Sequence, residues 1–171
     1  SISVNENQGL SGVRVVADKP IAVLSGTNGT NIGIDEYLNC GAADLTCTHL
    51  KPVDKWSDRF LTTQTLPYPA NNNARSVSDY LLITARDNGT VVNIAGNANY
   101  SKTLNAGEWF IYESPGATHH LITSNNPIQV IQMMKGWQCD NVNPADPTQM
   151  LVLEEDTWDD NYIITNPTQY A

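Results

Sequence analysis

The hydrophobic residues of this chain recur in short alternating runs rather than at helical spacing. β-Branched and aromatic side chains alternate with polar ones, and Gly, Pro, Asn or Asp bounds almost every run. A period of two is typical of strands that have one buried face. The sequence therefore predicts an all-β fold of antiparallel strands. The predicted strands are residues 13–17, 21–26, 59–65, 78–85, 90–95, 100–105, 108–113, 119–123, 128–135, 150–153 and 161–165.

Turn residues mark where the predicted strands reverse. Asn88-Gly89 separates the alternating runs 80–85 and 91–94 and predicts a hairpin, because this dipeptide supplies the positive φ angles of a type I′ turn. A second reversal is predicted at residues 105–107. The one segment with helical character is a single turn within residues 52–58.

The chain also repeats part of its own sequence. The stretch around Pro20 matches the stretch around Pro127, and the stretch around Trp56 matches that around Trp158, in the same order and roughly 105 residues apart. The match covers residues 12–65 and 119–167, with residues 78–118 between the copies. We interpret residues 1–171 as a single domain, an antiparallel β-sandwich built from about one and a half copies of the repeat. The alternative is a fragment of a β-propeller-like or multi-sandwich array.

Charge narrows the classes of partner. The chain has 18 acidic and 9 basic side chains, a net charge of -9, and its basic residues do not cluster. Nucleic acid and anionic membrane surfaces are therefore not expected as partners. No apolar run is long enough to cross a bilayer, so we expect no membrane insertion. The first residues lack the basic and apolar regions of a signal peptide, so a secreted chain would be a processed piece.

The chain has three cysteines. Cys40 and Cys47 enclose a short polar loop and are either a local disulfide or two unrelated thiols. Cys139 is then left over. It is a free thiol, a cross-link to another chain, or half of a bridge whose partner lies elsewhere.

Three tripeptides match the N-glycosylation pattern, at Asn28, Asn88 and Asn99. Together with a disulfide they favour an extracellular or cell-surface location. In a prokaryotic protein the three matches would carry no such meaning.

Four segments together resemble the N-terminal domain family of IgGFc-binding protein. They are the Lys-Pro-Ile-Ala-Val strand within residues 19–26, the Cys-Thr-His-Leu and Trp-containing stretch 47–56, the Asn-Ala-Gly-Glu turn within 104–108, and the strand entry 122–128. The resemblance runs from about residue 12 to residue 162, although Thr48 and Ser57 depart from the family pattern. It implies an extracellular, disulfide-containing, non-catalytic module of secreted or surface proteins, and it assigns no residue to immunoglobulin binding.

Catalytic signatures are missing from the sequence. Ser25 lacks the G-x-S-x-G context of a nucleophile elbow, and adjacent His119 and His120 on a strand would point to opposite faces. We therefore predict no catalytic residues and no enzymatic activity.

Two acidic segments could bind Ca²⁺ through carboxylate and carbonyl oxygens. One carries Asp156, Asp159 and Asp160, and the other is a loop with Asp140 and Asp146. We favour a solvated acidic edge, which keeps strands from pairing with neighbours, over a calcium site. We expect no cofactor, with Ca²⁺ as the one alternative.

Aromatic side chains suggest a second surface. Trp109 and Trp137, with Tyr68, Tyr100 and Tyr112, could form a platform on which sugars stack.

The leading prediction is nevertheless a non-enzymatic extracellular module for adhesion, matrix or fibre assembly, a segment or subunit of a larger protein. Its partners would be other protein chains or copies of itself. The alternative is a lectin-like domain, with or without calcium.

Overall fold

A computed structural model describes residues 10–30, 32, 44–65, 78–96, 99–115, 118–136 and 146–163. All strand pairs within these ranges are antiparallel, which confirms the predicted all-β sandwich. The elements are β1 (Val23–Thr30), β2 (Asp44–Leu50), the 3₁₀ turn η1 (Val53–Lys55), β3 (Ser57–Thr62), β4 (Asp79–Ala85), β5 (Thr90–Ala95), β6 (Tyr100–Leu104), β7 (Trp109–Ser114), β8 (His120–Met134), β9 (Thr148–Leu151) and η2 (Glu155–Thr157).

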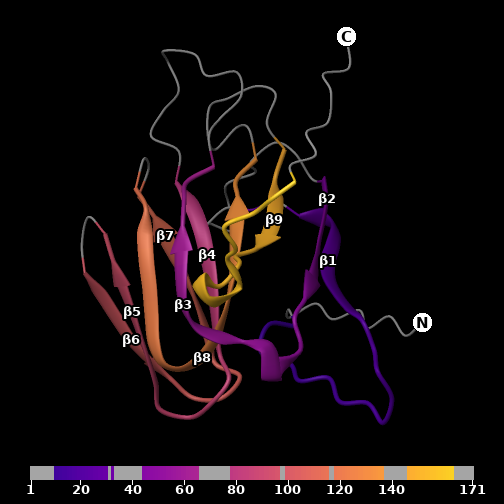
Figure 1. The fold of residues 1–171 in the computed structure, drawn as a ribbon. Helices are drawn as coiled ribbons and strands as arrows, with labels where there is room; N and C mark the ends of the chain where they lie inside the picture. The colour runs from indigo at the N-terminus through magenta and orange to yellow at the C-terminus, as the bar shows by residue number, and fades with distance from the viewer. Residues whose placement is uncertain are drawn as a thin grey trace.

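Strand β8 organises the sandwich. Its first part, residues 120–124, pairs with β3 on one side and β5 on the other. Its second part, residues 128–134, pairs with β4 and β9. Between the two parts the strand bends back at its lower end in Figure 1, so it belongs to both layers. β6 extends the first layer beyond β5, and β7 extends the second beyond β4.

The core lies between these two layers. Aliphatic and aromatic side chains from both layers form one buried cluster, as the alternating runs predict. Its members are Phe60, Leu81, Ile83, Ala85, Val92, Ile94, Leu104, Phe110, Ile122, Ile128, Val130 and Val152.

The predicted hairpin at Asn88-Gly89 is wrong in its pairing. A turn forms there, with Gly89 at φ 68°, but β4 and β5 pair with opposite parts of β8 and not with each other. The chain therefore crosses between layers at this turn. It crosses again between β6 and β7, where Gly107 has φ 78°.

Side-chain amides tie the crossings together at one end of the sandwich. Asn88 Oδ1 accepts a hydrogen bond from the Ala106 N–H at 2.9 Å. Asn125, in the bend of β8, accepts from the Val91 N–H at 2.6 Å and donates to the Gly89 carbonyl at 3.2 Å. The three crossings thus hold one another in place, which fixes the register of both layers.

Several predicted strands differ from the observed ones. Residues 13–17 form no strand, because nothing in the described chain pairs with them. β2 was not predicted, since its alternation is carried by Thr and Cys. The strands predicted at 119–123 and 128–135 are two parts of β8, and the single helical turn is η1. Residues 161–163 form no strand, and residues 164–165 lie outside the described ranges.

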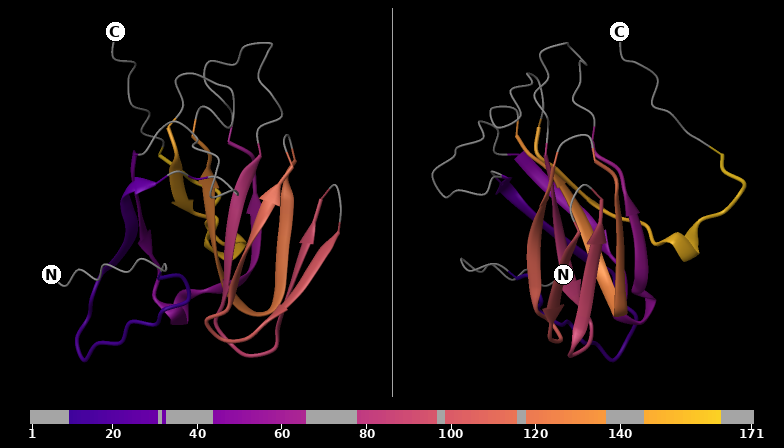
Figure 2. Two further views of the ribbon diagram at one scale, coloured as in Figure 1. Left: turned by 180° about the vertical axis from the view of Figure 1, so that it is seen from behind. Right: turned by 90° about the vertical axis from the view of Figure 1, so that its left-hand side faces the viewer.

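β1 and β2 form a separate two-stranded sheet beside β9. Gln149 of β9 donates a hydrogen bond to the Ser25 carbonyl of β1 at 2.7 Å. Figure 2 shows the yellow stretch after η2 standing clear of the strands. The stretch before β1 begins against the turn at Gly107, which Gly12 faces. The single-domain division of the sequence stays a prediction, as does the number of repeats.

Candidate functional site

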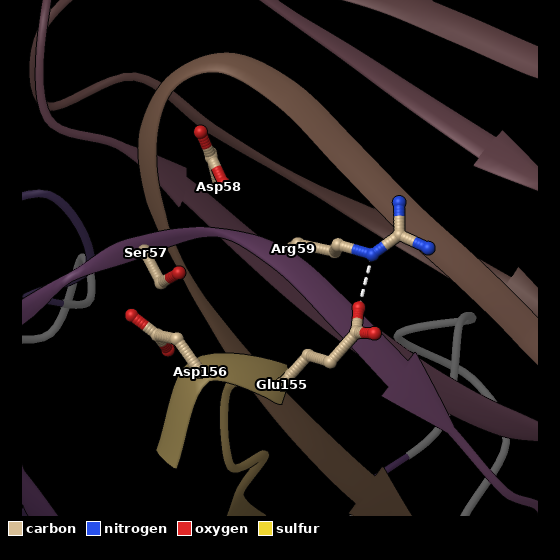
Figure 3. Close-up of a pocket in the computed structure, with 5 residues that line it drawn as sticks. All are labelled: Ser57, Asp58, Arg59, Glu155 and Asp156. Carbon is tan, nitrogen blue, oxygen red and sulfur yellow. Dashed lines mark hydrogen bonds and ion pairs between the residues drawn. The ribbon is translucent and has the colours of Figure 1, made fainter. Parts of the chain in front are cut away.

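A shallow pocket of about 260 Å³ lies where η2 meets β3. Its lining residues are Ser57, Asp58, Arg59, Glu155 and Asp156 (Figure 3). The Arg59 guanidinium donates to the Glu155 carboxylate, and both side chains are about half exposed. Three of the five lining side chains are carboxylates, and no histidine or cysteine is among them. The pocket is a charged junction between β3 and η2.

The acidic segment around η2 is used mainly for ion pairs and backbone contacts. Glu154 is 3% exposed and pairs with Lys51, while Asp159 Oδ1 accepts a hydrogen bond from the Asp160 N–H at 2.8 Å. Within the described ranges no group of three or more His, Cys, Asp or Glu side chains lies close enough to hold a metal ion. The structure thus does not gather Asp156, Asp159 and Asp160 around one point.

The other predicted calcium segment is only partly described. Asp146 is exposed before β9, and Asp140 lies outside the described residues. Calcium binding by this loop stays a prediction.

Sequence reasoning missed a buried polar network between β3, β4 and β8. Asp79 is 1% exposed and accepts hydrogen bonds from Thr65 N–H at 2.8 Å, Thr65 Oγ1 at 2.6 Å and Gln132 Nε2 at 2.6 Å. Gln132 also donates to the Thr63 carbonyl at 2.7 Å. The network anchors the end of β3 to the second layer, so its role is structural. An acidic residue at the start of an otherwise apolar strand was the available signal.

A second charged group sits at the edge between β4 and β7. Lys135 Nζ lies 2.8 Å from Glu113 Oε1 and 4.6 Å from the ring centre of Tyr80. Burial alone would raise the pKa of Glu113, but hydrogen bonds from Lys135 and Ser78 outweigh it and lower that pKa. Burial alone would lower the pKa of Lys135, but the hydrogen bond to Glu113 and contacts with Tyr80 raise it. Both shifts favour the ion pair, which holds the edge together.

The predicted aromatic platform is divided by the fold. Tyr112 is half-buried, and Tyr100 stacks against Phe110 and Tyr112 with ring centres 5.7 and 5.4 Å apart. Trp109 is 44% exposed on β7, next to the outward-facing Ile111. Trp137 and Tyr68 lie outside the described residues. Of the predicted platform, the structure thus places Trp109 and Tyr100, which is 38% exposed, on the surface.

Exposed apolar side chains occur on β1 and β2 and in the segment that precedes β1. Leu24 on β1 and Leu45 on β2 are 68% and 73% exposed. Val13, Val15 and Val16, which precede β1, are 63%, 59% and 79% exposed. Exposed apolar groups concentrated in one part of a protein mark a contact surface. β1 pairs with β2 on one side, and none of the described strands pairs with its other side.

The model of the IgGFc binding protein family matches residues 1–171, the whole chain. The chain belongs to the IgGFc-binding family. This confirms the resemblance drawn from the four sequence segments. Members of the family are typically extracellular or secreted binding modules. The comparisons with curated proteins and with solved structures found no match.

The three asparagines of the N-glycosylation tripeptides are accessible. Asn28 lies on β1, Asn88 in the first layer crossing and Asn99 just before β6, and all three are exposed. Their glycosylation stays a prediction. No helix among the described residues is long and apolar enough to cross a membrane.

Among the described residues, cysteine and histidine side chains belong to no group of three or more potential metal ligands. Cys47 is exposed on β2, and no disulfide joins it to another described residue. Cys40 and Cys139 lie outside the described residues, so the disulfide and the cross-link stay predictions. His119 is exposed and His120 is fully buried, which fits the expected opposite orientations. His120 Nε2 lies 2.8 Å from Ser114 Oγ, a structural contact between β8 and β7.

Proposed function

We propose that this member of the IgGFc-binding family is a non-enzymatic extracellular module that binds protein through the open edge of β1 and serves adhesion, matrix or fibre assembly. The observation that carries the proposal is the open side of β1, with Leu24 68% exposed beside it. An unpaired strand edge offers backbone N–H and C=O groups to another chain, and nearby apolar side chains add contact area. The family assignment supports an extracellular binding role.

A bead-aggregation assay tests this function. Beads coated with the chain should cluster in buffer, and a Leu24→Asp coat should reduce clustering because a charge on the edge opposes strand addition. Ile111→Asp is the matched control, since Ile111 is a 50% exposed apolar residue on the distant strand β7. Equal clustering by all three coats, or none by the unaltered chain, would contradict the proposal.

Glycan binding is the second candidate, because Trp109 and Ile111 form an exposed apolar stretch on β7. A glycan array probed with and without a calcium chelator tests it. Retention of a sugar that Trp109→Ala abolishes would favour this role. Retention that survives Trp109→Ala would assign it elsewhere, and no retention in either condition would remove it.

A further inference from the structure

The two β-hairpins that precede η1 and η2 share one pairing scheme. In the first hairpin, β1 and β2 pair Leu24 with His49 and continue in step to Thr27 with Thr46. In the second, residues 131–134 of β8 and strand β9 pair in the same way, from Ile131 with Leu151 to Met134 with Thr148. These pairs coincide when the two sequence copies are aligned at their prolines and tryptophans. The sequence match is therefore also a match of register.

The segment after each hairpin is matched as well. η1 and η2 are both three-residue 3₁₀ turns, and each ends at a tryptophan in extended conformation. Trp56 has φ -72° and ψ 150°, and Trp158 has φ -75° and ψ 146°. The chain therefore leaves both turns with the same backbone geometry, which directs it into a strand.

Beyond the tryptophans the two copies differ. After Trp56 the chain forms β3, whose Phe60 pairs with Ile122 in the first part of β8. Phe60 is 1% exposed. After Trp158 the chain has no strand partner among the described residues, and Tyr162, which corresponds to Phe60, is 64% exposed. Its hydroxyl instead accepts a hydrogen bond from the Asp159 N–H at 2.7 Å.

The missing partner also has a counterpart in the chain. The first part of β8 corresponds to residues 13–17, which precede β1 as that part precedes the second hairpin. These residues are exposed and unpaired, with Val15 59% and Val16 79% exposed. Two apolar segments without partners thus correspond to two strands that pair with each other.

We propose that residues 161–163 of one copy of this chain form a strand that pairs antiparallel with residues 14–16 of a second copy. The register follows from β3 and β8: Tyr162 opposite Val15, and Ile163 opposite Arg14. Within one chain, β3 belongs to the first sequence repeat and pairs with the first part of β8, which begins the second repeat. The same contact between two molecules joins the end of one chain to the start of the next, head to tail. Head-to-tail contacts that do not close produce a filament. This inference rests on the proposed role in fibre assembly and names the partner as the chain itself.

Cysteine pairing tests the register. One preparation carries Val15→Cys and another carries Tyr162→Cys, both in full chains whose Cys40, Cys47 and Cys139 are replaced by Ser. Opposed residues of antiparallel strands have Cα atoms about 4.5–5.5 Å apart, within reach of a disulfide. We expect the mixed preparations to form a disulfide-linked heterodimer on mild oxidation. A Val16→Cys preparation is the control, because its side chain faces the opposite side of the strand.

Two results would overturn the inference. One is a heterodimer yield that is no higher with Val15→Cys than with Val16→Cys. The other is a double variant, Val15→Cys with Tyr162→Cys, that forms an intramolecular disulfide at every concentration, since closure within one chain leaves no site for a second copy. Thermal unfolding of each variant checks that these exposed substitutions leave the fold intact.

The outcome separates this contact from the wider function. Heterodimer formation without clustering of beads would support the contact and contradict the adhesive role. Clustering without heterodimer formation would support adhesion through the β1 edge and remove the head-to-tail contact.

Discussion

Replacing the buried carboxylate of Asp79 should destabilise the sandwich strongly. Asp79→Ala removes three short hydrogen bonds, two from Thr65 and one from Gln132. A hydrogen bond to a charged group contributes about 1.5–3 kcal/mol. Thr65 can turn partly to water, and Gln132 keeps its bond to the Thr63 carbonyl. We therefore expect a loss of about 3–5 kcal/mol in the free energy of unfolding, less than the full sum of the three bonds.

Urea unfolding followed by tryptophan fluorescence measures this loss. Asp79→Asn keeps an acceptor oxygen, so it should cost less, about 1–2 kcal/mol. Asp58→Ala is the control, because Asp58 is an exposed carboxylate on β3. The dependence on urea should keep its slope in all variants, since the same surface is exposed on unfolding. An Asp79→Ala chain within about 1 kcal/mol of the unaltered chain would refute the reasoning, as would an equal loss from Asp58→Ala.

Three further predictions follow from single contacts. Gly12→Ala should lower the free energy of unfolding by about 1 kcal/mol or more. Gly12 has φ 83°, and an added Cβ would lie 2.0 Å from the Gly107 carbonyl oxygen. Thermal unfolding measures the loss. Burial lowers the pKa of His120, so the unfolded chain binds more protons just below pH 6.5. Stability should therefore fall as the pH drops through about 6.5 towards the folded pKa, and His120→Gln should flatten that slope in urea titrations at pH 5 to 7. Glu154→Ala should lower the free energy of unfolding by about 1–3 kcal/mol, because it leaves the partly buried Lys51 without its ion-pair partner. Glu155→Ala should lower it by less than about 1 kcal/mol, because its pair with Arg59 is half exposed. A larger loss for Glu155→Ala than for Glu154→Ala would contradict this.

The sequence predicted strands better than it predicted their partners. Residues 90–95 form a strand with the predicted bounds, because alternating Val and Ile side chains leave one face to bury. The turn at Asn88-Gly89 was also predicted, since its chemistry is local. That turn nevertheless joins two layers instead of two paired strands. Pairing depends on which chain lies beside a strand, and β8, far along the sequence, takes the place that a hairpin partner would hold.

The candidate site was less predictable than the fold. Acidic density around Asp156 suggested a solvated edge, with Ca²⁺ as the alternative, and the structure adds ion pairs for two neighbouring carboxylates: Glu154 contacts Lys51 and Glu155 contacts Arg59. Lys51 and Arg59 lie about 100 residues before these acids in the sequence. The spacing of the acids along the chain therefore did not indicate which cations they pair with. The open edge of β1 was equally invisible, because an alternating run looks the same whether one or two strands flank it.

Residues 13–17 show why the pattern of a strand does not suffice to make one. They correspond to residues 120–124 of β8, where Ile122 is fully buried between β3 and β5. Val15, its counterpart, is 59% exposed, although both are β-branched residues suited to a sheet. The difference lies in the neighbours, since extended backbone is stable only when its N–H and C=O groups have partners. The predicted strand at 13–17 is therefore wrong for the isolated chain, and the proposed contact would supply the missing partner from residues 161–163 of a second copy.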